Sequence, residues 1–127
     1  MSEICIKAGG VFAILLFVFH LFFWKIFQWK TELRKLNKFN KRVLPILNLC
    51  LMFVFGIVAF ISLSYTTNMI ETDLGHVLLL LIGLFWLFRA ILQVTYFTLK
   101  TVKSTLFFLI FCIGAFLYLY PCFIILS

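Results

Sequence analysis

Long apolar runs alternate with short polar segments along the chain. Four runs occupy residues 8–28, 44–65, 75–97 and 105–125. About 20 helical residues cross the roughly 30 Å hydrocarbon core of a bilayer, so each run is long enough to span a membrane. The runs are continuous, whereas the strands of a transmembrane barrel would alternate in segments of about ten residues. The pattern predicts an all-α protein that forms a single integral membrane domain over residues 1–127.

Short connections between the runs predict how the helices are arranged. Consecutive helices joined by short loops pack as antiparallel neighbours, so we expect a transmembrane up-down four-helix bundle. Small residues let helices approach each other closely in lipid. The small residues expected at such contacts are Gly56, Ala59, Ser62, Gly114 and Ala115.

Composition supports a membrane environment. Apolar residues make up 65% of the chain and charged residues 12%, and 18 residues are phenylalanine. A soluble domain is about half apolar and one quarter charged. A small domain buries only about 60 to 70% of its surface, so the excess apolar surface requires lipid. These values exclude soluble enzymes and nucleic-acid-binding proteins, because the net charge of +7 is concentrated in one loop between spans.

The charges of the loops predict the orientation of the spans. The first loop carries one acidic residue, Glu32, and a set of basic residues: Lys30, Arg34, Lys35, Lys38, Lys41 and Arg42. The second loop carries Glu71 and Asp73, and the third carries Lys100 and Lys103. Basic loops stay in the cytoplasm. The first and third loops are therefore expected in the cytoplasm, with the amino and carboxyl termini both outside.

The first loop has a second possible role at the membrane surface. Leu33, Leu36, Phe39 and Val43 fall close to helical spacing, which is typical of a partly helical segment lying on the inner surface. Each basic residue near anionic lipid contributes about 1 kcal/mol of binding free energy. Two interpretations stay open: the basic residues fix topology, or they bind an anionic headgroup or a protein.

Arg89 interrupts the third run in the middle of the stretch W-L-F-R-A-I-L-Q. It lies eight residues before Phe97. At 1.5 Å per residue its Cα is about 12 Å from the end of the run. Placing an arginine at the centre of a bilayer costs about 2.5 to 3.5 kcal/mol on insertion scales. We therefore expect its side chain to face other helices and to find polar partners there.

Polar residues of three runs are expected at the depth of Arg89. Gln93 lies one helical turn after Arg89 and Trp86 lies one turn before it, on the same face. Trp86 is a candidate for a cation–π contact. The second run contributes Asn48 and the first contributes His20. The sequence predicts a polar cluster, the candidate ligand-binding set, which consists of His20, Asn48, Arg89 and Gln93 with Trp24 and Trp86 beside them.

The chemistry of the predicted cluster depends on the partner of Arg89. No carboxylate occurs in any of the four runs. A guanidinium binds phosphate and carboxylate groups through its planar fork, so Arg89 is a candidate anion site for a lipid phosphate or a small carboxylate. The alternative is structural, in which Arg89 bonds Asn48, Gln93 and backbone carbonyls and fixes the register of the helices.

Other kinds of site receive little support. His20 and His76 lie at different depths, and neither has a cysteine or carboxylate at ligand spacing, so no metal or haem is predicted. No motif for hydrolysis, phosphate binding or dinucleotide binding is present, and no cofactor is expected. Cys5 and Cys122 are both expected near the outer face, and whether they pair in an oxidising compartment stays open.

Several segments between His20 and Gln93 resemble those of a known group of proteins. They read HLFFWKIFQWK, LRKLNKFNKRVLPILN, DLGH and LFWLFRAILQ. Together they resemble a group of small four-span bacterial integral membrane proteins of unknown function. The resemblance implies the four-span fold and a location in a bacterial cytoplasmic (inner) membrane, and it brings no activity with it.

The chain also shows a weaker similarity to the microsomal glutathione transferase and eicosanoid-enzyme family. Those proteins have four spans with both termini outside the cytoplasm, and a set of polar residues surrounds a glutathione thiolate. The positions that match this scheme are Glu32, Arg34, Asn37, Asn40, Arg89 and Tyr96. The family's Glu-Arg pair is adjacent, whereas Glu32 and Arg34 are not, and the second acidic residue after the asparagine is missing.

Two functional hypotheses follow. In the first, the protein is a non-catalytic accessory or a lipid- or anion-binding membrane component, organised around Arg89. In the second, it is a small membrane enzyme that acts on a lipophilic or thiol substrate at the cytoplasmic leaflet. A pocket beside Arg89 and His20 that opens to the cytoplasm would favour the enzyme. The expected partner is the lipid bilayer, with a second copy or another membrane protein as alternatives and no nucleic acid.

Overall fold

A computed structural model describes residues 1–126, which are almost entirely helical. The elements in chain order are α1 (Ser2–Leu21), α2 (Phe23–Ile26), α3 (Trp29–Glu32), the 3-10 helix η1 (Leu33–Lys35), α4 (Lys38–Ser64), α5 (Thr66–Glu71), α6 (Asp73–Phe97) and α7 (Val102–Leu126). Helices α1, α4, α6 and α7 are each long and apolar enough to cross a membrane. The all-α class and the bundle of four spans are therefore confirmed, and the chain is an integral membrane protein.

The first span lies nearer the amino terminus than predicted. A continuous helix was expected over residues 8–28, but α1 begins at Ser2 and ends at Leu21, and the short helix α2 follows after a turn at Phe22. A second turn ends α2, where Gln28 adopts a left-handed conformation with φ of 52°. Hydropathy reports the environment of a segment and not its backbone path. The apolar sequence continues through these turns although the chain changes direction, and its aromatic side chains are exposed or half-buried, with Phe22 52% and Trp24 48% exposed.

Capping side chains set the starts of two other spans. Helix α4 begins at Lys38, before the predicted start at residue 44, because the Asn37 side chain accepts a hydrogen bond of 2.8 Å from the backbone N–H of Asn40. Helix α6 begins at Asp73, where the Thr72 hydroxyl accepts from the N–H of Gly75 at 3.0 Å. The third and fourth spans agree with the predicted runs within a few residues.

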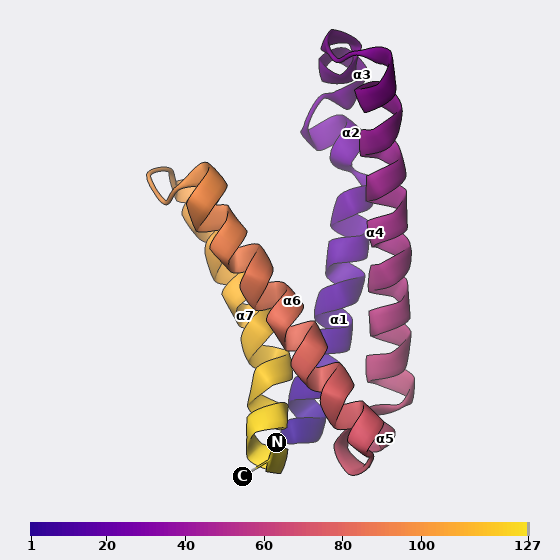
Figure 1. The fold of residues 1–127 in the computed structure, drawn as a ribbon, viewed down its shortest axis with the longest axis vertical. Helices are drawn as coiled ribbons and strands as arrows, with labels where there is room; N and C mark the ends of the chain where they lie inside the picture. Colours follow the sequence, from indigo (N-terminus) through magenta and orange to yellow (C-terminus); the bar gives the residue numbers. More distant parts are fainter. Residues whose placement is uncertain (127) are drawn as a thin grey trace.

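The four long helices form two antiparallel hairpins. Helix α1 packs against α4, α6 packs against α7, and α1 joins the hairpins by packing against α7. Figure 1 shows the hairpins meeting at the end that carries Met1, α5 and Leu126, here called the terminal end, and diverging toward the end that carries α2 and α3, here called the basic end. Within residues 1–126 the consecutive spans α4 and α6 do not pack along each other, contrary to the expectation for consecutive helices.

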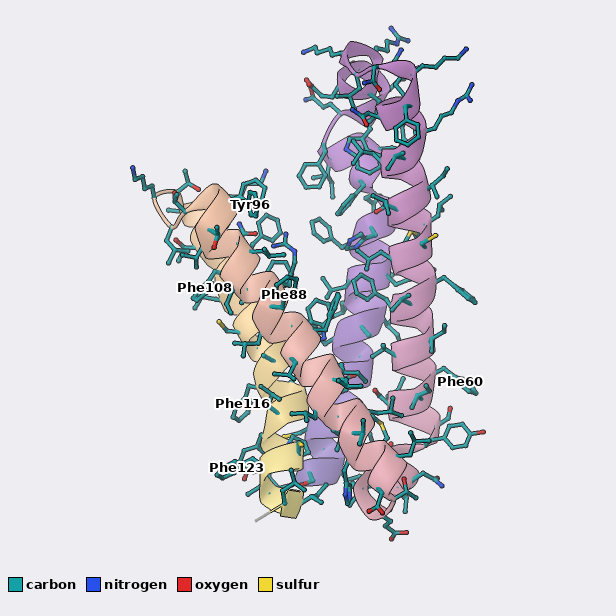
Figure 2. All side chains as sticks on the ribbon, viewed as in Figure 1. Phe60, Phe88, Tyr96, Phe108, Phe116 and Phe123 are labelled. Carbon is teal, nitrogen blue, oxygen red and sulfur yellow. The ribbon has the colours of Figure 1, made fainter. Side chains whose placement is uncertain are left out.

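Aromatic side chains cover the outside of the bundle. Figure 2 shows Phe60, Phe116 and Phe123 pointing away from the helices, and Phe88 is 60% exposed. Such exposure of large apolar side chains on every side is the pattern of a protein that lipid surrounds. At the basic end the predicted basic residues are all exposed: Lys30, Arg34, Lys35, Lys38, Lys41 and Arg42. The polar segment that carries them folds into α3, η1 and the first turn of α4.

Glycine allows the two hairpins to approach closely at the terminal end. A Cβ atom added to Gly9 of α1 would lie 2.6 Å from two ring atoms of Tyr118 on α7. Tyr118 is fully buried, and its hydroxyl lies 2.7 Å from the hydroxyl of Ser62 on α4. Tyr118 therefore crosses α1 at Gly9 and ties α7 to α4. Hydrogen bonds of this kind between membrane helices contribute about 0.6 kcal/mol on average.

Two more glycines extend the close packing toward the middle of the bundle. A Cβ on Gly83 of α6 would lie 2.5 Å from the Leu119 side chain, and a Cβ on Gly114 of α7 would lie 2.7 Å from the Phe12 ring. The prediction of close contact was right for Gly114 and wrong for Gly56, which has nothing within 4 Å of its added Cβ. Gly56 is exposed and lines a shallow hollow with Ile14 and Phe17 of α1, where an added Cβ meets open space.

The four cysteines are free in the structure. Cys5 and Cys122 are both buried at the terminal end, and the Cys122 thiol lies 3.9 Å from the carbonyl oxygen of His76. Cys50 is exposed on α4. Cysteines in these positions act as small apolar side chains.

The packing predicts opposite effects of the same substitution at two glycines. Gly9→Ala should lower the free energy of unfolding by about 1 to 3 kcal/mol, because the buried Tyr118 ring must move away from the new methyl group. Gly56→Ala should leave stability unchanged or raise it by up to about 1 kcal/mol, because alanine is the better helix former. Thermal unfolding in a mild detergent measures both. Equal stability of the two variants would contradict the packing described here.

Candidate functional site: a pocket between the hairpins

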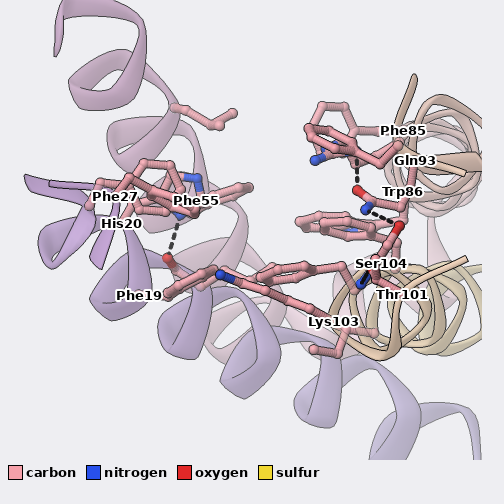
Figure 3. A pocket seen from close by; sticks show the side chains of 18 residues that line it. Phe19, His20, Phe27, Phe55, Phe85, Trp86, Gln93, Thr101, Lys103 and Ser104 are labelled. Carbon is pink, nitrogen blue, oxygen red and sulfur yellow. Dashed lines mark hydrogen bonds between the residues drawn. The ribbon is translucent and has the colours of Figure 1, made fainter. Parts of the chain in front are cut away.

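A pocket of about 340 Å³ lies between the hairpins where they diverge (Figure 3). Helices α1, α2, α4, α6 and α7 all contribute to its lining. Half of the lining side chains are phenylalanine or tryptophan, namely Phe19, Phe23, Phe27, Phe55, Phe85, Trp86, Phe97, Phe107 and Phe111. The polar or charged ones are His20, Arg89, Gln93, Thr101, Lys103 and Ser104. Its volume is within the range of sites that bind small molecules and cofactors.

Three stacked rings separate the pocket from the close-packed terminal end. The Trp86 ring of α6 lies between Phe55 of α4 and Phe111 of α7, with centroids 5.5 and 6.0 Å away and interplanar angles of 18° and 9°. We call these three side chains the aromatic stack. Phe12 meets Trp86 edge-on at 5.1 Å, and Gly114 leaves room for both rings. The aromatic stack connects both hairpins and forms the floor of the pocket.

Arg89 lies above this floor and is half-buried. Its Nη1 donates a hydrogen bond of 3.2 Å to Oε1 of Gln93, and its Cζ lies 4.4 Å from the centroid of the Phe111 ring. The predicted partnership with Gln93 is confirmed. The cation–π contact is made with Phe111 of the neighbouring helix and not with Trp86 of the same helix, because the guanidinium turns toward α7.

A chain of hydrogen bonds orients the Gln93 amide toward Arg89. The Ser104 hydroxyl donates to the carbonyl oxygen of Thr98, so its oxygen is left to accept from Nε2 of Gln93 at 3.0 Å. With its NH₂ group engaged in this way, Gln93 presents Oε1 to the guanidinium. The chain runs from the turn between α6 and α7 to Arg89 and fixes the position of the charged group.

His20 and Asn48 form a second polar group on the opposite hairpin. Nδ1 of His20 lies 2.7 Å from the carbonyl oxygen of Leu16, which accepts only, so Nδ1 carries the hydrogen and the neutral ring offers Nε2 as an acceptor. The ring stacks on Phe23 with centroids 4.2 Å apart. Asn48 donates from Nδ2 to the carbonyl oxygen of His20 at 3.1 Å. These contacts hold the end of α1, where the helix stops.

The predicted cluster is thus divided between two sides of one pocket. Figure 3 shows His20 on one side, with Gln93 and Trp86 on the other. Asn48 lies behind His20 and does not line the pocket. Trp24 lies outside as well, because it is 48% exposed and packs edge-on against Trp29 at 5.8 Å. Trp24 was predicted beside the cluster on the assumption of a straight helix. Because Trp24 follows the bend at Phe22, it lies outside the pocket instead.

Three of the polar or charged lining residues were not foreseen from the sequence. Thr101, Lys103 and Ser104 lie at the turn between α6 and α7 and at the start of α7. Lys103 extends its ammonium group to 5.8 Å from the centroid of the Phe27 ring, across the mouth of the pocket. In the sequence, Lys103 serves only to predict which side of the membrane the third loop occupies. No sequence signal indicates that the turn brings Lys103 to the pocket that Arg89 also lines.

The charge of the pocket is positive. Arg89 and Lys103 line it, and no carboxylate does. Within residues 1–126 the ion pairs are Glu3 with Lys7 at 3.1 Å and Glu32 with Lys35 at 3.4 Å, and both are exposed. Arg89 therefore has one amide oxygen and one aromatic face as partners within the described chain, although a guanidinium carries five N–H donors.

Two buried polar atoms near the pocket have no hydrogen-bond partner within the described residues. They are Nε1 of Trp86 and Oδ1 of Asn48. The Trp86 indole takes part in the aromatic stack, one helical turn from Arg89. Asn48 uses its NH₂ group for His20 and also lies 3.6 Å from the Met52 sulfur. Buried polar atoms without partners are rare in proteins and concentrate at functional or strained positions.

Positions matched to the glutathione transferase scheme lie mostly away from the pocket. Glu32 pairs with Lys35, Asn37 caps α4, and Tyr96 is 77% exposed. Of the six matched positions, all within the described residues, Arg89 is the one that lines the pocket. Residues 1–126 contain no group of three or more His, Cys, Asp or Glu side chains placed to hold a metal ion.

The hydrogen-bond chain predicts a difference between two adjacent hydroxyl residues. Ser104→Ala should lower the free energy of unfolding by about 1 to 3 kcal/mol, because it leaves the buried Gln93 amide and the Thr98 carbonyl without a partner. Thr105→Ala is the control, since its exposed hydroxyl bonds to carbonyl groups of its own turn. Its effect should stay below about 1 kcal/mol. Thermal unfolding of both variants tests this, and a larger effect at Thr105 would contradict the assignment.

Comparisons of the chain with protein-family models, with curated proteins and with solved structures found no match. The functional argument therefore depends on the side chains of the pocket themselves.

Proposed function

We propose that the protein binds an amphipathic anion, consisting of a phosphate or carboxylate group on an apolar body, in the pocket between the hairpins. The observation that carries this proposal is the position of Arg89. Its guanidinium lines a largely aromatic pocket, and no acidic side chain within residues 1–126 pairs with it. A cation that is half-buried among apolar side chains is costly unless an anion approaches it, so a bound anion would stabilise the site.

Each part of the pocket has a role in this binding. Arg89 supplies the fork of donors for two oxygens of the anion, and Gln93 holds it in place. Lys103 adds a second positive charge at the mouth, from the neighbouring helix. The aromatic side chains bury the apolar body of the ligand. The role is a non-catalytic one, as a lipid- or anion-binding membrane component or an accessory subunit.

A second candidate is a small membrane enzyme that acts on a lipophilic or thiol substrate. The observation that favours it is the pocket itself, in which the acceptor nitrogen of His20 offers a base on the side opposite Arg89. A general base near pH 7 and a cationic anchor are parts of many hydrolytic and transfer sites. Binding without catalysis is the better supported proposal, because no carboxylate or serine-type nucleophile paired with a base lines the pocket.

The location proposed for the pocket is the cytoplasmic half of a bacterial inner membrane. The basic end carries the exposed lysines and arginines of the first loop, and the positive-inside rule supports a cytoplasmic position for such a segment. The same residues approach anionic lipid headgroups at that surface. The pocket then opens toward the inner leaflet.

Native mass spectrometry tests the binding proposal. Wild-type protein released from a mild detergent should carry a discrete extra mass, which corresponds to an anionic amphipathic compound, and Arg89→Leu should lose it. Arg42→Leu is the matched control, because it removes an exposed arginine of α4 outside the pocket and should keep the extra mass. Retention of the mass by Arg89→Leu, or a bare wild-type protein after exposure to anionic lipids and aromatic phosphates, would contradict the proposal.

Cysteine labelling tests the proposed orientation. In a variant whose native cysteines are replaced by alanine, Lys35→Cys should resist an impermeant thiol reagent added to intact cells, because the basic end faces the cytoplasm. Glu71→Cys, at the opposite end, should react. Labelling at residue 35 together with protection at residue 71 would reverse the orientation.

A further inference from the structure

We infer that the anion is the headgroup of a two-chain phospholipid, which enters the pocket sideways from the bilayer between α4 and α6. This inference rests on the proposed function and adds the class of ligand and the route by which it arrives. It follows from which sides of the pocket other helices close and which side they leave open.

Packed side chains close three sides of the pocket. Helix α1 packs against α4 and α6 packs against α7 within the hairpins. Between the hairpins, α1 packs against α7 toward the terminal end, and at the pocket Phe19 of α1 stacks on Phe107 of α7 with centroids 5.9 Å apart. The remaining pair, α4 and α6, does not pack along its length within the described residues. Figure 1 shows α4 and α6 diverging toward the basic end. The pocket therefore faces the lipid on the side between these two helices.

Apolar side chains form both edges of this opening. Leu51 and Phe55 line the pocket from α4, and Phe85 lines it from α6 together with Arg89. Phe85 is 41% exposed although it lines the pocket, so it lies at the boundary with lipid. Edges of this kind present no polar group to a hydrocarbon chain that crosses them. We call the space between Leu51 and Phe85 the lateral opening.

The route from the cytoplasm is more obstructed. Phe23 and Phe27 come from the segment around α2, which lies toward the basic end of the pocket. The Lys103 ammonium group reaches across from α7 to the Phe27 ring at 5.8 Å. A water-soluble anion would have to pass these aromatic side chains, whereas a lipid of the adjacent leaflet meets the lateral opening directly.

The size and depth of the pocket favour a lipid headgroup. A pocket of about 340 Å³ holds a headgroup and the first part of its chains, in the range of small-molecule sites. The rest of two acyl chains must leave it, and the lateral opening leads them back into the bilayer. Arg89 lies about 12 Å below the end of α6 by helical rise, so the headgroup would sink below its usual level and exchange water for the guanidinium.

A pair of tryptophan substitutions on α4 tests the lateral opening. Leu51→Trp narrows the opening, whereas Phe53→Trp is the matched control, because Phe53 is exposed on the lipid face of α4 and does not line the pocket. Phe85→Trp narrows the opening from the other edge and serves as a second variant. Thermal unfolding verifies that each variant folds. The probes are dioleoyl phosphatidylglycerol, which has two chains, and 1-naphthyl phosphate, a compact anion that fits within the pocket.

The expected result distinguishes the two probes. Measured by native mass spectrometry, Leu51→Trp and Phe85→Trp should reduce phosphatidylglycerol binding at least tenfold more than they reduce 1-naphthyl phosphate binding. Phe53→Trp should change neither, and Arg89→Leu should lose both. Equal losses of the two probes in the narrowed variants, or no loss of the lipid, would overturn the lateral opening.

Wild-type binding separates this inference from the proposed function. If the wild type binds 1-naphthyl phosphate but not phosphatidylglycerol, the ligand is a compact anion, and the inference fails while the proposed function stands. If the wild type binds neither probe, the proposed function fails as well.

Discussion

The close approach of Gly9 to the Tyr118 ring is the contact on which the rest of the structure depends. It brings α1 and α7 together at the terminal end, where the Tyr118 hydroxyl also reaches Ser62 of α4. Without an apolar driving force between helices in lipid, tight packing of small residues and a few buried hydrogen bonds hold the spans together. The hairpins are joined at this end, and they diverge toward the other.

The pocket lies where the two hairpins diverge, and the close packing between them ends at its floor. The aromatic stack of Phe55, Trp86 and Phe111 connects the hairpins midway and separates close-packed side chains from the pocket. Beyond it, Arg89 stands among aromatic rings with Gln93 as its hydrogen-bond partner. A charge that lipid alone would strongly disfavour is tolerated because an aromatic face and an oriented amide meet it at one place, and the proposed anion would stabilise it further.

The sequence predicts some features of this arrangement and misses others for physical reasons. Four spans follow from run length, and the bond between Arg89 and Gln93 follows from helical spacing, because both depend on residues close together in the chain. The bend after Leu21 was missed, because hydropathy does not change at a backbone turn within an apolar segment. That bend removes Trp24 from the pocket.

Contacts between distant segments were the hardest to foresee. Lys103 and Ser104 line the pocket because the turn after α6 brings the start of α7 beside Arg89, and the sequence alone does not fix that geometry. The contacts of small residues were equally hard to predict from the sequence. Gly9 and Gly83 lie at close contacts whereas Gly56 faces outward, although all three appear equivalent in an apolar run.

The measurement that tests the central claim most directly is quenching of Trp86 fluorescence by a brominated anion. In a Trp24→Phe, Trp29→Phe double variant, Trp86 is the remaining tryptophan and lies one helical turn from Arg89. Titration with 4-bromobenzyl phosphate should give saturable quenching that Arg89→Leu abolishes, while the neutral 4-bromobenzyl alcohol should quench weakly and without saturation. Equal quenching by the two compounds, or saturable quenching that survives Arg89→Leu, would contradict an anion site built on Arg89.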